Sequence, residues 1–336
     1  MNLVKKALKA REATSLLFLV ALFVIVSLIN PSFASSENIA AVFNSSVVYI
    51  LIAVGMAFAI IVGEIDVSVG SCLGFVATVV GSMLRDGHNW LLAFVVGILI
   101  GIVIGFINGW GVAVMGVPSL IFTLGVNGVL RGAMYIYSGG AWVENLPKAF
   151  KDFSSATLLG KLTVYCCCAF LLVIAIHLLL TRTRKGRYFT AVGDNAGGAM
   201  LVGISPVRTK VTAYVICSVM AAIAGIIFCS RIGFVTSTSG NGYEMKAVAA
   251  CVLGGISLTG GVGSVLGAAI GAVIMSSISY LLVFMGFSSN YDNAITGVIL
   301  ISIVVFDAVI QYRASVRSRH ERLAARTGNA EGGAVR

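Results

Sequence analysis

The sequence has little charge. Charged residues make up 11% of its 336 residues, whereas hydrophobic residues make up 58%. A soluble domain carries about 25% charged residues, so this chain lacks the polar side chains that a water-facing surface needs, and a soluble enzyme is excluded. Prolines are also scarce, at 4, but glycines number 39. Because glycine is frequent in membrane helices and lets their backbones approach closely, the composition predicts an all-α, polytopic membrane helical bundle.

The sequence also lacks the motifs of catalytic chemistry. It contains no GxxxxGK[ST] phosphate-binding loop and no HExxH, GxSxG or CxxC pattern. Its seven cysteines lie in apolar segments without a paired metal-ligand spacing, and we interpret them as small hydrophobic residues. We therefore expect no catalytic residues, no metal and no cofactor. An ATP-hydrolysing site, if one serves this chain, must lie in another subunit.

Ten apolar segments have the length and composition of membrane spans. A transmembrane helix needs about 20 mainly apolar residues, and a span boundary drawn from sequence is uncertain by a few residues. The segments are residues 14–30, 47–63, 67–84, 91–115, 118–138, 162–181, 211–233, 245–260, 262–286 and 294–312.

Basic residues orient these spans. Three blocks fall on one side of a ten-span chain, and loops with excess Lys and Arg face the cytoplasm. The opposite loop after the fifth span holds only Lys148, Lys151 and Lys161. The three blocks are Lys5, Lys6, Lys9 and Arg11; Arg182, Arg184, Lys185, Arg187, Arg208 and Lys210; and Arg313, Arg317, Arg319, Arg322, Arg326 and Arg336. Both termini are therefore predicted to lie in the cytoplasm. The spans are predicted to cross the inner (plasma) membrane of a bacterium.

This topology divides the chain into three parts. Residues 1–13 form a cytoplasmic N-terminus, residues 14–312 a transmembrane domain, and residues 313–336 a basic cytoplasmic tail. The transmembrane domain has one long cytoplasmic loop, at about residues 182–210, and one long outer loop, at about residues 139–161.

Carboxylates are scarce within the spans. A proton- or sodium-coupled carrier usually carries such groups at mid-depth, so their scarcity argues against ion coupling and places the energy source outside this chain. Asp66 has two interpretations: it caps a helix that begins at Val67, or it serves in gating or subunit contact. Arg131 is expected to anchor its helix to a neighbour's carbonyl groups.

Uncharged polar residues do occur within the spans. Asn108, Thr123, Asn127 and Ser276 suit a translocation path for a neutral, hydroxyl-rich solute. The competing interpretation for each is a hydrogen bond between helices. A stripe of glycines four residues apart, at positions 97, 101, 105 and 109, predicts close packing of that helix against a neighbour.

The cytoplasmic loop holds a short predicted helix at about Asn195–Val202. Asp194 or Asn195 can cap its start, and Gly203 can end it in the left-handed conformation. A helix held between two spans is well placed to dock into another protein. The alternative is a plain connecting loop.

Four segments carry a resemblance to a known family. They are IDVSVGS at 65–71, VPSLIFTLG at 117–125, GRYFTAVGDNAGGAMLVGI at 186–204 and MKAVAACVLGGISLTGGVGSVLG at 245–267. In order along the chain, they resemble the permease subunits of ribose-type (carbohydrate uptake class 2) ABC importers. With SGGAWVENLP at 138–147, the chain is most similar to autoinducer-2 import permeases, although rhamnose-type permeases share part of the pattern.

The resemblance implies partners and a mechanism. Such permeases form a membrane dimer of two like or two different subunits, with about ten spans each. A separate ATP-binding cassette ATPase docks on the cytoplasmic loops, and an extracytoplasmic solute-binding protein delivers the solute. By similarity, Gly193, Asp194, Asn195 and Gly203 would lie in or near the loop that contacts the ATPase. The chain departs from many relatives at Glu64, where they carry glycine. The alternative function is an ion-coupled secondary carrier or a facilitator for a similar solute.

Overall fold

The computed structural model describes residues 11–286, 288, 291–302, 304–305 and 309. The predicted C-terminal tail and the first residues of the predicted N-terminus lie outside these residues. The elements run in the order α2 (Arg11–Ile29), η1 (Pro31–Ala34), α3 (Ser36–Ile61), α4 (Val69–Arg85), α5 (Trp90–Ala113), α6 (Ser119–Ser138), α7 (Lys148–Ser155), β1 (Thr157–Leu159), β2 (Leu162–Thr163), α8 (Val164–Arg182), α9 (Arg184–Asp194), α10 (Ala196–Leu201), α11 (Pro206–Ile232), α12 (Tyr243–Leu253) and α13 (Val265–Phe284). Residues 291–302 are also helical.

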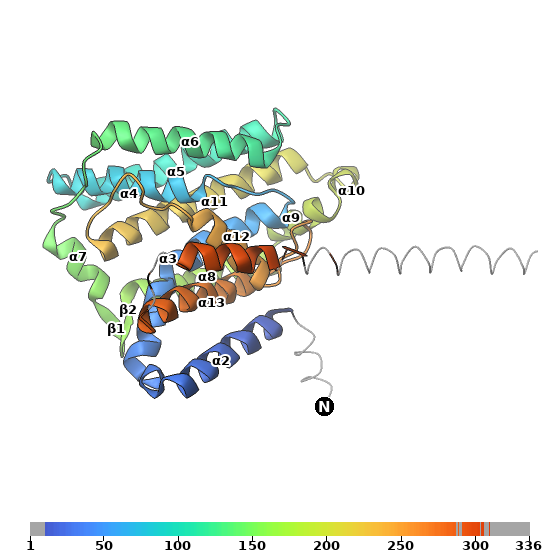
Figure 1. Cartoon of the computed structure of the whole chain (residues 1–336). Coiled ribbons are helices and arrows are strands. Elements are labelled where there is room, and N and C mark those ends of the chain that lie inside the picture. The colour runs from blue at the N-terminus through green and yellow to red at the C-terminus, as the bar shows by residue number, and fades with distance from the viewer. Residues whose placement is uncertain (1–10, 287, 289–290, 303, 306–308, 310–336) are drawn as a thin grey trace, which may run out of the picture.

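The helices form a bundle whose centre is α3 and α11. Nearly every side chain of the second half of α3 is fully buried, and α11 packs against α5, α3 and α4. In Figure 1, α6 and α2 lie on opposite edges of the bundle. The loop with α9 and α10 lies at one end, hereafter the α10 end. Helix α7 and the antiparallel β1–β2 hairpin lie at the other, hereafter the α7 end.

The structure confirms a polytopic all-α membrane bundle. Within the described residues, six helices are long and apolar enough to cross a membrane, and α2 and α4 contain shorter apolar stretches. These eight helices fall on eight of the ten predicted spans. The last predicted span, at 294–312, is described only in part; its helix begins at 291.

The predicted span at 245–260 is wrong as a continuous helix. Helix α12 has only 11 residues, and the segment after it turns where Gly255, Gly260 and Gly261 take positive φ angles. Such angles cost glycine little but would strain other residues. Apolar composition alone cannot distinguish a membrane helix from an apolar turn that is packed inside the protein, and this explains the error.

The segment before α12 enters the bundle through consecutive turns at residues 237–242. After α11 ends, Val235 pairs with Val143 at the α7 end. The chain then runs back along α4, where Gly240 lies against the backbone of Gly70 and Gly74. Helix α12 thus begins inside the bundle. Glycines on both sides of this contact allow two backbones to touch where a side chain would separate them.

The predicted glycine stripe on α5 is confirmed as a packing surface. A Cβ atom at Gly101 would lie 2.9 Å from the Ser218 carbonyl oxygen, and one at Gly109 would lie 2.7 Å from the Cα atom of Val211. Because real Cβ atoms do not come this close, α5 meets α11 backbone to backbone.

Candidate functional site

The cytoplasmic loop predicted at 182–210 contains two helices rather than one. Sequence reasoning missed α9, whose start is capped by Thr183 Oγ1 accepting from the Gly186 amide at 2.9 Å. Helix α10 matches the short helix expected near this position. Asn195 Oδ1 accepts from the Gly198 amide at 2.9 Å at its start, and Gly203 follows its end with a φ of 81°.

The joint between α9 and α10 packs directly on the bundle. A Cβ atom at Gly193 would overlap the carbonyl oxygen of Ile61, the last residue of α3, and Gly261 lies against Asp194. The Gly261 amide donates to that same Ile61 oxygen at 2.9 Å. Three segments thus meet through their backbones: the end of α3, the α9–α10 joint and the turn between α12 and α13. A displacement of the joint must therefore press on both neighbours.

The tip of this loop exposes apolar side chains. Met200, Leu201 and Val202 are 64%, 90% and 74% exposed, and they stand at the end of the bundle beyond the membrane helices (Figure 1). Exposed apolar side chains grouped at the end of one short helix are typical of a surface that contacts a protein or a membrane. Asp194 and Asn195 are also exposed and border this surface.

A buried polar cluster lies near the same end, between α4, α5 and α6. The Asp66 side chain is fully buried, and its Oδ1 accepts from the Ser68 amide at 2.9 Å and the Ser68 hydroxyl at 2.6 Å. Asn108 Nδ2 donates to Ser68 Oγ at 2.7 Å and to both Asp66 oxygens at 3.3 Å. Helix α4 begins at Val69, two residues later than expected, so Asp66 closes the turn before the helix.

Polar groups continue from this cluster along α6. Thr123 Oγ1 accepts from the Val67 amide at 3.0 Å, and Asn127 and Arg131 follow at four-residue spacing on the same stripe. Helix α6 is about 30 Å long at 1.5 Å per residue, so Asn127 and Arg131 lie about 12 and 18 Å along it, near mid-depth. The structure therefore places Asn108, Thr123 and Asn127, which the sequence proposed one by one as path residues, along one side of the bundle.

The chain entering α12 completes this row. Arg131 Nη1 donates to the Ser239 carbonyl at 2.6 Å, which is the anchoring expected for it. Glu244 Oε1 accepts from the Gly242 amide at 3.2 Å. Among the described residues, Asn127 Oδ1, Arg131 Nη2 and Glu244 Oε2 are buried without a hydrogen-bond partner. Such atoms are costly, and together they offer donors and acceptors to a bound molecule. We call Asn108, Thr123, Asn127, Arg131 and Glu244 the polar row.

Sequence reasoning missed Glu244 and the entering chain because neither belongs to a regular span. The hydroxyl-rich run of residues 236–241 was the available signal. Ser276, by contrast, does not join the polar row. Its hydroxyl lies 3.1 Å from that of Ser45 on α3, in the contact between α13 and α3. This is a hydrogen bond between helices, the interpretation that competed with a role on the path.

A second polar group surrounds Lys246. Its ammonium group is buried, pairs with Asp292 and lies 5.2 Å from the centre of the Tyr49 ring. Ser279 Oγ donates to the other Asp292 oxygen at 2.8 Å. These partners satisfy a charge that would be very costly alone. No set of three His, Cys, Asp or Glu side chains in the described part of the chain is placed to hold a metal.

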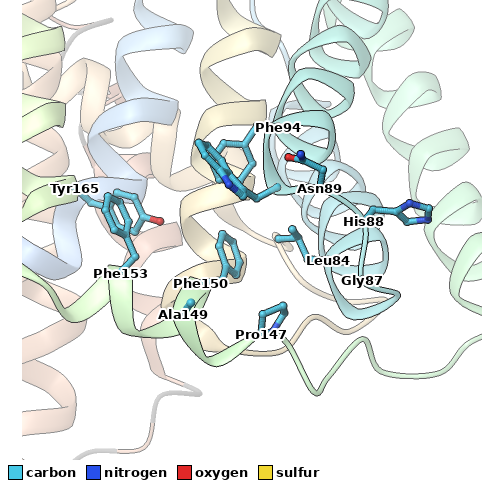
Figure 2. A pocket seen from close by; sticks show the side chains of 11 residues that line it. Leu84, Gly87, His88, Asn89, Phe94, Pro147, Ala149, Phe150, Phe153 and Tyr165 are labelled. Carbon is cyan, nitrogen blue, oxygen red and sulfur yellow. The ribbon is translucent and has the colours of Figure 1, made fainter.

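A cavity of about 640 Å³ lies at the α7 end. Figure 2 shows its aromatic wall, with Phe150 between Phe94 and the neighbouring pair Phe153 and Tyr165. Arg85, beside this wall, donates from Nε to Asp86 Oδ1 at 2.8 Å, and this hydrogen bond holds the pKa of Asp86 below its usual value. The aromatic wall contrasts with the polar row and does not suit a hydroxyl-rich solute.

Comparisons with known proteins identify the family of the chain. Residues 38–304 match the family described as branched-chain amino acid transport system / permease component. The chain is 39% identical over 318 residues to the autoinducer 2 import system permease protein LsrC of Enterobacter sp. (strain 638), covering 95% of this chain and 92% of that protein. The protein of the same name from Salmonella typhi is 39% identical over 316 residues, covering 94% and 90%. No solved structure matches the chain.

Proposed function

The chain belongs to the family of branched-chain amino acid transport system permease components, and we propose that it carries autoinducer 2 into the cell as the membrane subunit of an ATP-driven importer. The relatives that match 94–95% of the chain are named for import of that solute. They favour this function over an ion-coupled carrier or a facilitator.

The α9–α10 loop is the docking site of the ATPase in this proposal. The observation that supports this most strongly is the exposure of Met200, Leu201 and Val202 at the tip of the loop. The base of the loop, at Gly193, packs on the backbone of Ile61. In this proposal the ATPase covers the exposed apolar side chains at the tip of the loop. Because the base of the loop packs on backbone, a movement of the ATPase is transmitted to α3 and to the α12–α13 turn. Coupling between two sites requires such a linked element.

The polar row is the path in this proposal. It runs from Asn108 near the α10 end through Thr123 and Asn127 to Arg131 and Glu244 near mid-depth. Its unpartnered atoms are both donors and acceptors, as recognition of a neutral, hydroxyl-rich solute requires. Glu244 opens a helix that begins inside the bundle, which is where many transporters hold their substrates.

The finer topology follows the charge pattern. Ten crossings, of which the one through α12 is a short helix followed by turns, agree with the positive-inside rule when both termini and the α9–α10 loop are cytoplasmic. Residues 14–312 would form the transmembrane domain. A second permease subunit, alike or different, would complete the membrane unit. An extracytoplasmic binding protein would deliver solute at the α7 end.

Reconstitution tests the function directly. Liposomes that contain this chain, the second permease subunit if it is a different one, the ATPase and the binding protein should accumulate autoinducer 2 only with ATP. Ribose and rhamnose serve as competitors. Deletion of residues 194–203 should abolish uptake while the chain still inserts. ATP-independent uptake by the chain alone would reject the proposal, and equal uptake of a competitor would reject the solute.

A further inference from the structure

The cavity at the α7 end has a wall of aromatic rings that the transport proposal does not use. Trp90 and Phe94 of α5 have ring centres 5.7 Å apart, Phe94 and Phe150 are 6.2 Å apart, and Phe153 and Tyr165 are 5.3 Å apart. These rings come from α5 and, much later in the sequence, from α7 and α8. The cavity that they enclose measures about 640 Å³.

Two polar groups of the wall have partners within the chain. Asn89 Oδ1 accepts from the Leu91 amide at 2.8 Å and so caps α5. The Tyr165 hydroxyl donates to Ser230 Oγ at 3.1 Å. His88 points away from the rings in Figure 2. The wall therefore offers a ligand mainly apolar surface, and the part of the ligand that it encloses must be apolar.

The position of the cavity indicates where such a ligand comes from. Helices α5 and α8 both have the length and hydropathy of membrane-crossing helices, and the cavity lies where each begins, at Trp90 and Val164. Trp90 is 62% exposed and Phe153 is 49% exposed. Exposed aromatic rings at the end of membrane helices mark the boundary between headgroups and acyl chains. At that depth, lipid is the most abundant apolar molecule.

Helix α7 supplies charge beside the apolar wall. Ala149, Phe150 and Phe153 line the cavity, whereas Lys148 and Lys151 of the same helix are exposed. The acidic groups of the adjoining segments are Glu144 and Asp152, which are exposed, and Asp86, which is paired with Arg85. Lys148 and Lys151 are thus the cations that α7 offers beside the cavity, and an ammonium group suits a phosphate.

We infer that this cavity binds an acyl chain of a membrane phospholipid, whose phosphate pairs with Lys148 and Lys151. The acyl chain packs among the five aromatic rings, and the lipid headgroup stays at the water boundary beside α7. The lipid thereby holds α7 against the start of α5. This site is independent of the solute path and of the ATPase-docking loop.

Fluorescence quenching tests the inference, because the chain has three tryptophans and only Trp90 lines the cavity. In delipidated protein in detergent, a variant with Trp110→Phe and Trp142→Phe keeps Trp90 alone. The matched control keeps Trp142, which also lies at the α7 end, stacked on Phe234 at 5.6 Å. Phosphatidylglycerol with brominated acyl chains is then titrated at low mole ratios.

Quenching of Trp90 should saturate at about one lipid per chain, whereas quenching of Trp142 should rise without saturation. Ala149→Phe should fill the cavity and weaken binding at least ten-fold, and the same change at the exposed Ala141 should leave binding unchanged. Replacing Lys148 and Lys151 by glutamine should weaken binding about five-fold for each charge removed. Every variant is first checked for an unchanged thermal transition.

Three results would overturn the inference. The first is identical, non-saturating quenching of Trp90 and Trp142. The second is binding that is unaffected by Ala149→Phe in protein with a normal thermal transition. The third is a Trp90 response to autoinducer 2 with none to the lipid, which would assign the cavity to the solute.

Discussion

Helices α5 and α6 both carry a row of glycines, but the two rows have opposite surroundings. On α5, every glycine of the stripe lies against the backbone or side chains of a neighbour. On α6, an added Cβ atom at Gly125, Gly128 or Gly132 would meet nothing within 4 Å among the described residues. Both rows have the spacing of one helix face, at steps of three or four residues.

The difference separates two uses of glycine in a membrane bundle. The α5 row closes a contact inside the chain, since α11 fills the space that side chains would occupy. The α6 row leaves its face open to lipid or to another subunit. Spacing predicts that a row is a packing surface but does not identify the partner, and only the α5 partner lies within the described chain.

Gly105→Leu should destabilise the protein more than any other change on these two glycine rows. A Cβ atom at this position would lie 2.5 Å from the Cα atom of Val215 and 2.7 Å from the Tyr214 carbonyl oxygen. Since backbone cannot move aside as a flexible side chain does, the change should cost about 3 kcal/mol or more. Size-exclusion chromatography and thermal unfolding of the purified protein would measure it. Gly128→Leu on the open row is the control, and an equal loss in both variants would contradict the contrast.

The same contrast exists within the docking loop. At Gly193 a Cβ atom would overlap the Ile61 carbonyl, whereas at Gly197 its nearest neighbour would be the Asn195 side chain at 3.5 Å. Gly193→Ala should displace the loop from α3 and reduce ATP-driven uptake about ten-fold or more, and Gly197→Ala should leave it near normal. The measurement that distinguishes the two variants is uptake in reconstituted liposomes, normalised to the amount of inserted protein. Normal uptake by Gly193→Ala would mean that the backbone contact does not transmit movement.

Hydropathy predicted much of the fold because most spans are continuous apolar helices. Eight predicted spans coincide with helices, but two kinds of detail escaped. Helix α3 begins at Ser36, whereas the predicted span begins at residue 47, because Asn44, Ser45 and Ser46 interrupt the apolar run. Their polar groups find partners across the bundle or within the helix turn, which no local pattern reveals.

The second kind of detail is the broken passage into α12. Residues 236–241 look like a surface loop, yet Gly240 lies against α4, so tertiary packing decides their depth. The candidate site shows the same limit. Asn108, Thr123 and Asn127 were found from their polarity inside apolar helices. Glu244 escaped because its neighbours had to be known first, and Ser276 showed the same polarity without the same neighbours.

The two asparagines of the polar row, Asn108 on α5 and Asn127 on α6, extend the contrast between these helices to hydrogen bonds. Asn108 Nδ2 on α5 donates to Ser68 and Asp66. Its Oδ1, like Asn127 Oδ1 on α6, has no partner among the described residues. Asn108→Leu would leave the buried Asp66 poorly satisfied and should cost about 1–3 kcal/mol. Asn127→Leu should change stability by less than about 0.5 kcal/mol but raise the KM for uptake.

Thermal unfolding and initial uptake rates of these two variants are the required measurements. Asn108→Asp has a similar size but places a second carboxyl group beside the buried Asp66, so it should destabilise the chain at least as much as Asn108→Leu. If Asn127→Leu destabilised the chain as much as Asn108→Leu, Asn127 would have a structural partner and would not be a free group on the path. If its KM were unchanged, it would not touch the solute.

Gly128→Ala should have the smallest effect, and its sign is informative. In a helix interior, alanine is favoured over glycine by about 0.5–1 kcal/mol because it loses less conformational entropy on folding. Since an added Cβ atom at Gly128 meets nothing within 4 Å in the described part of the chain, no clash offsets this gain. The thermal transition of the isolated chain should therefore rise slightly. A fall would mean that a neighbour packs on Gly128. If that fall occurred only in the assembled importer and not in the isolated chain, the open face of α6 would be where the second permease sits.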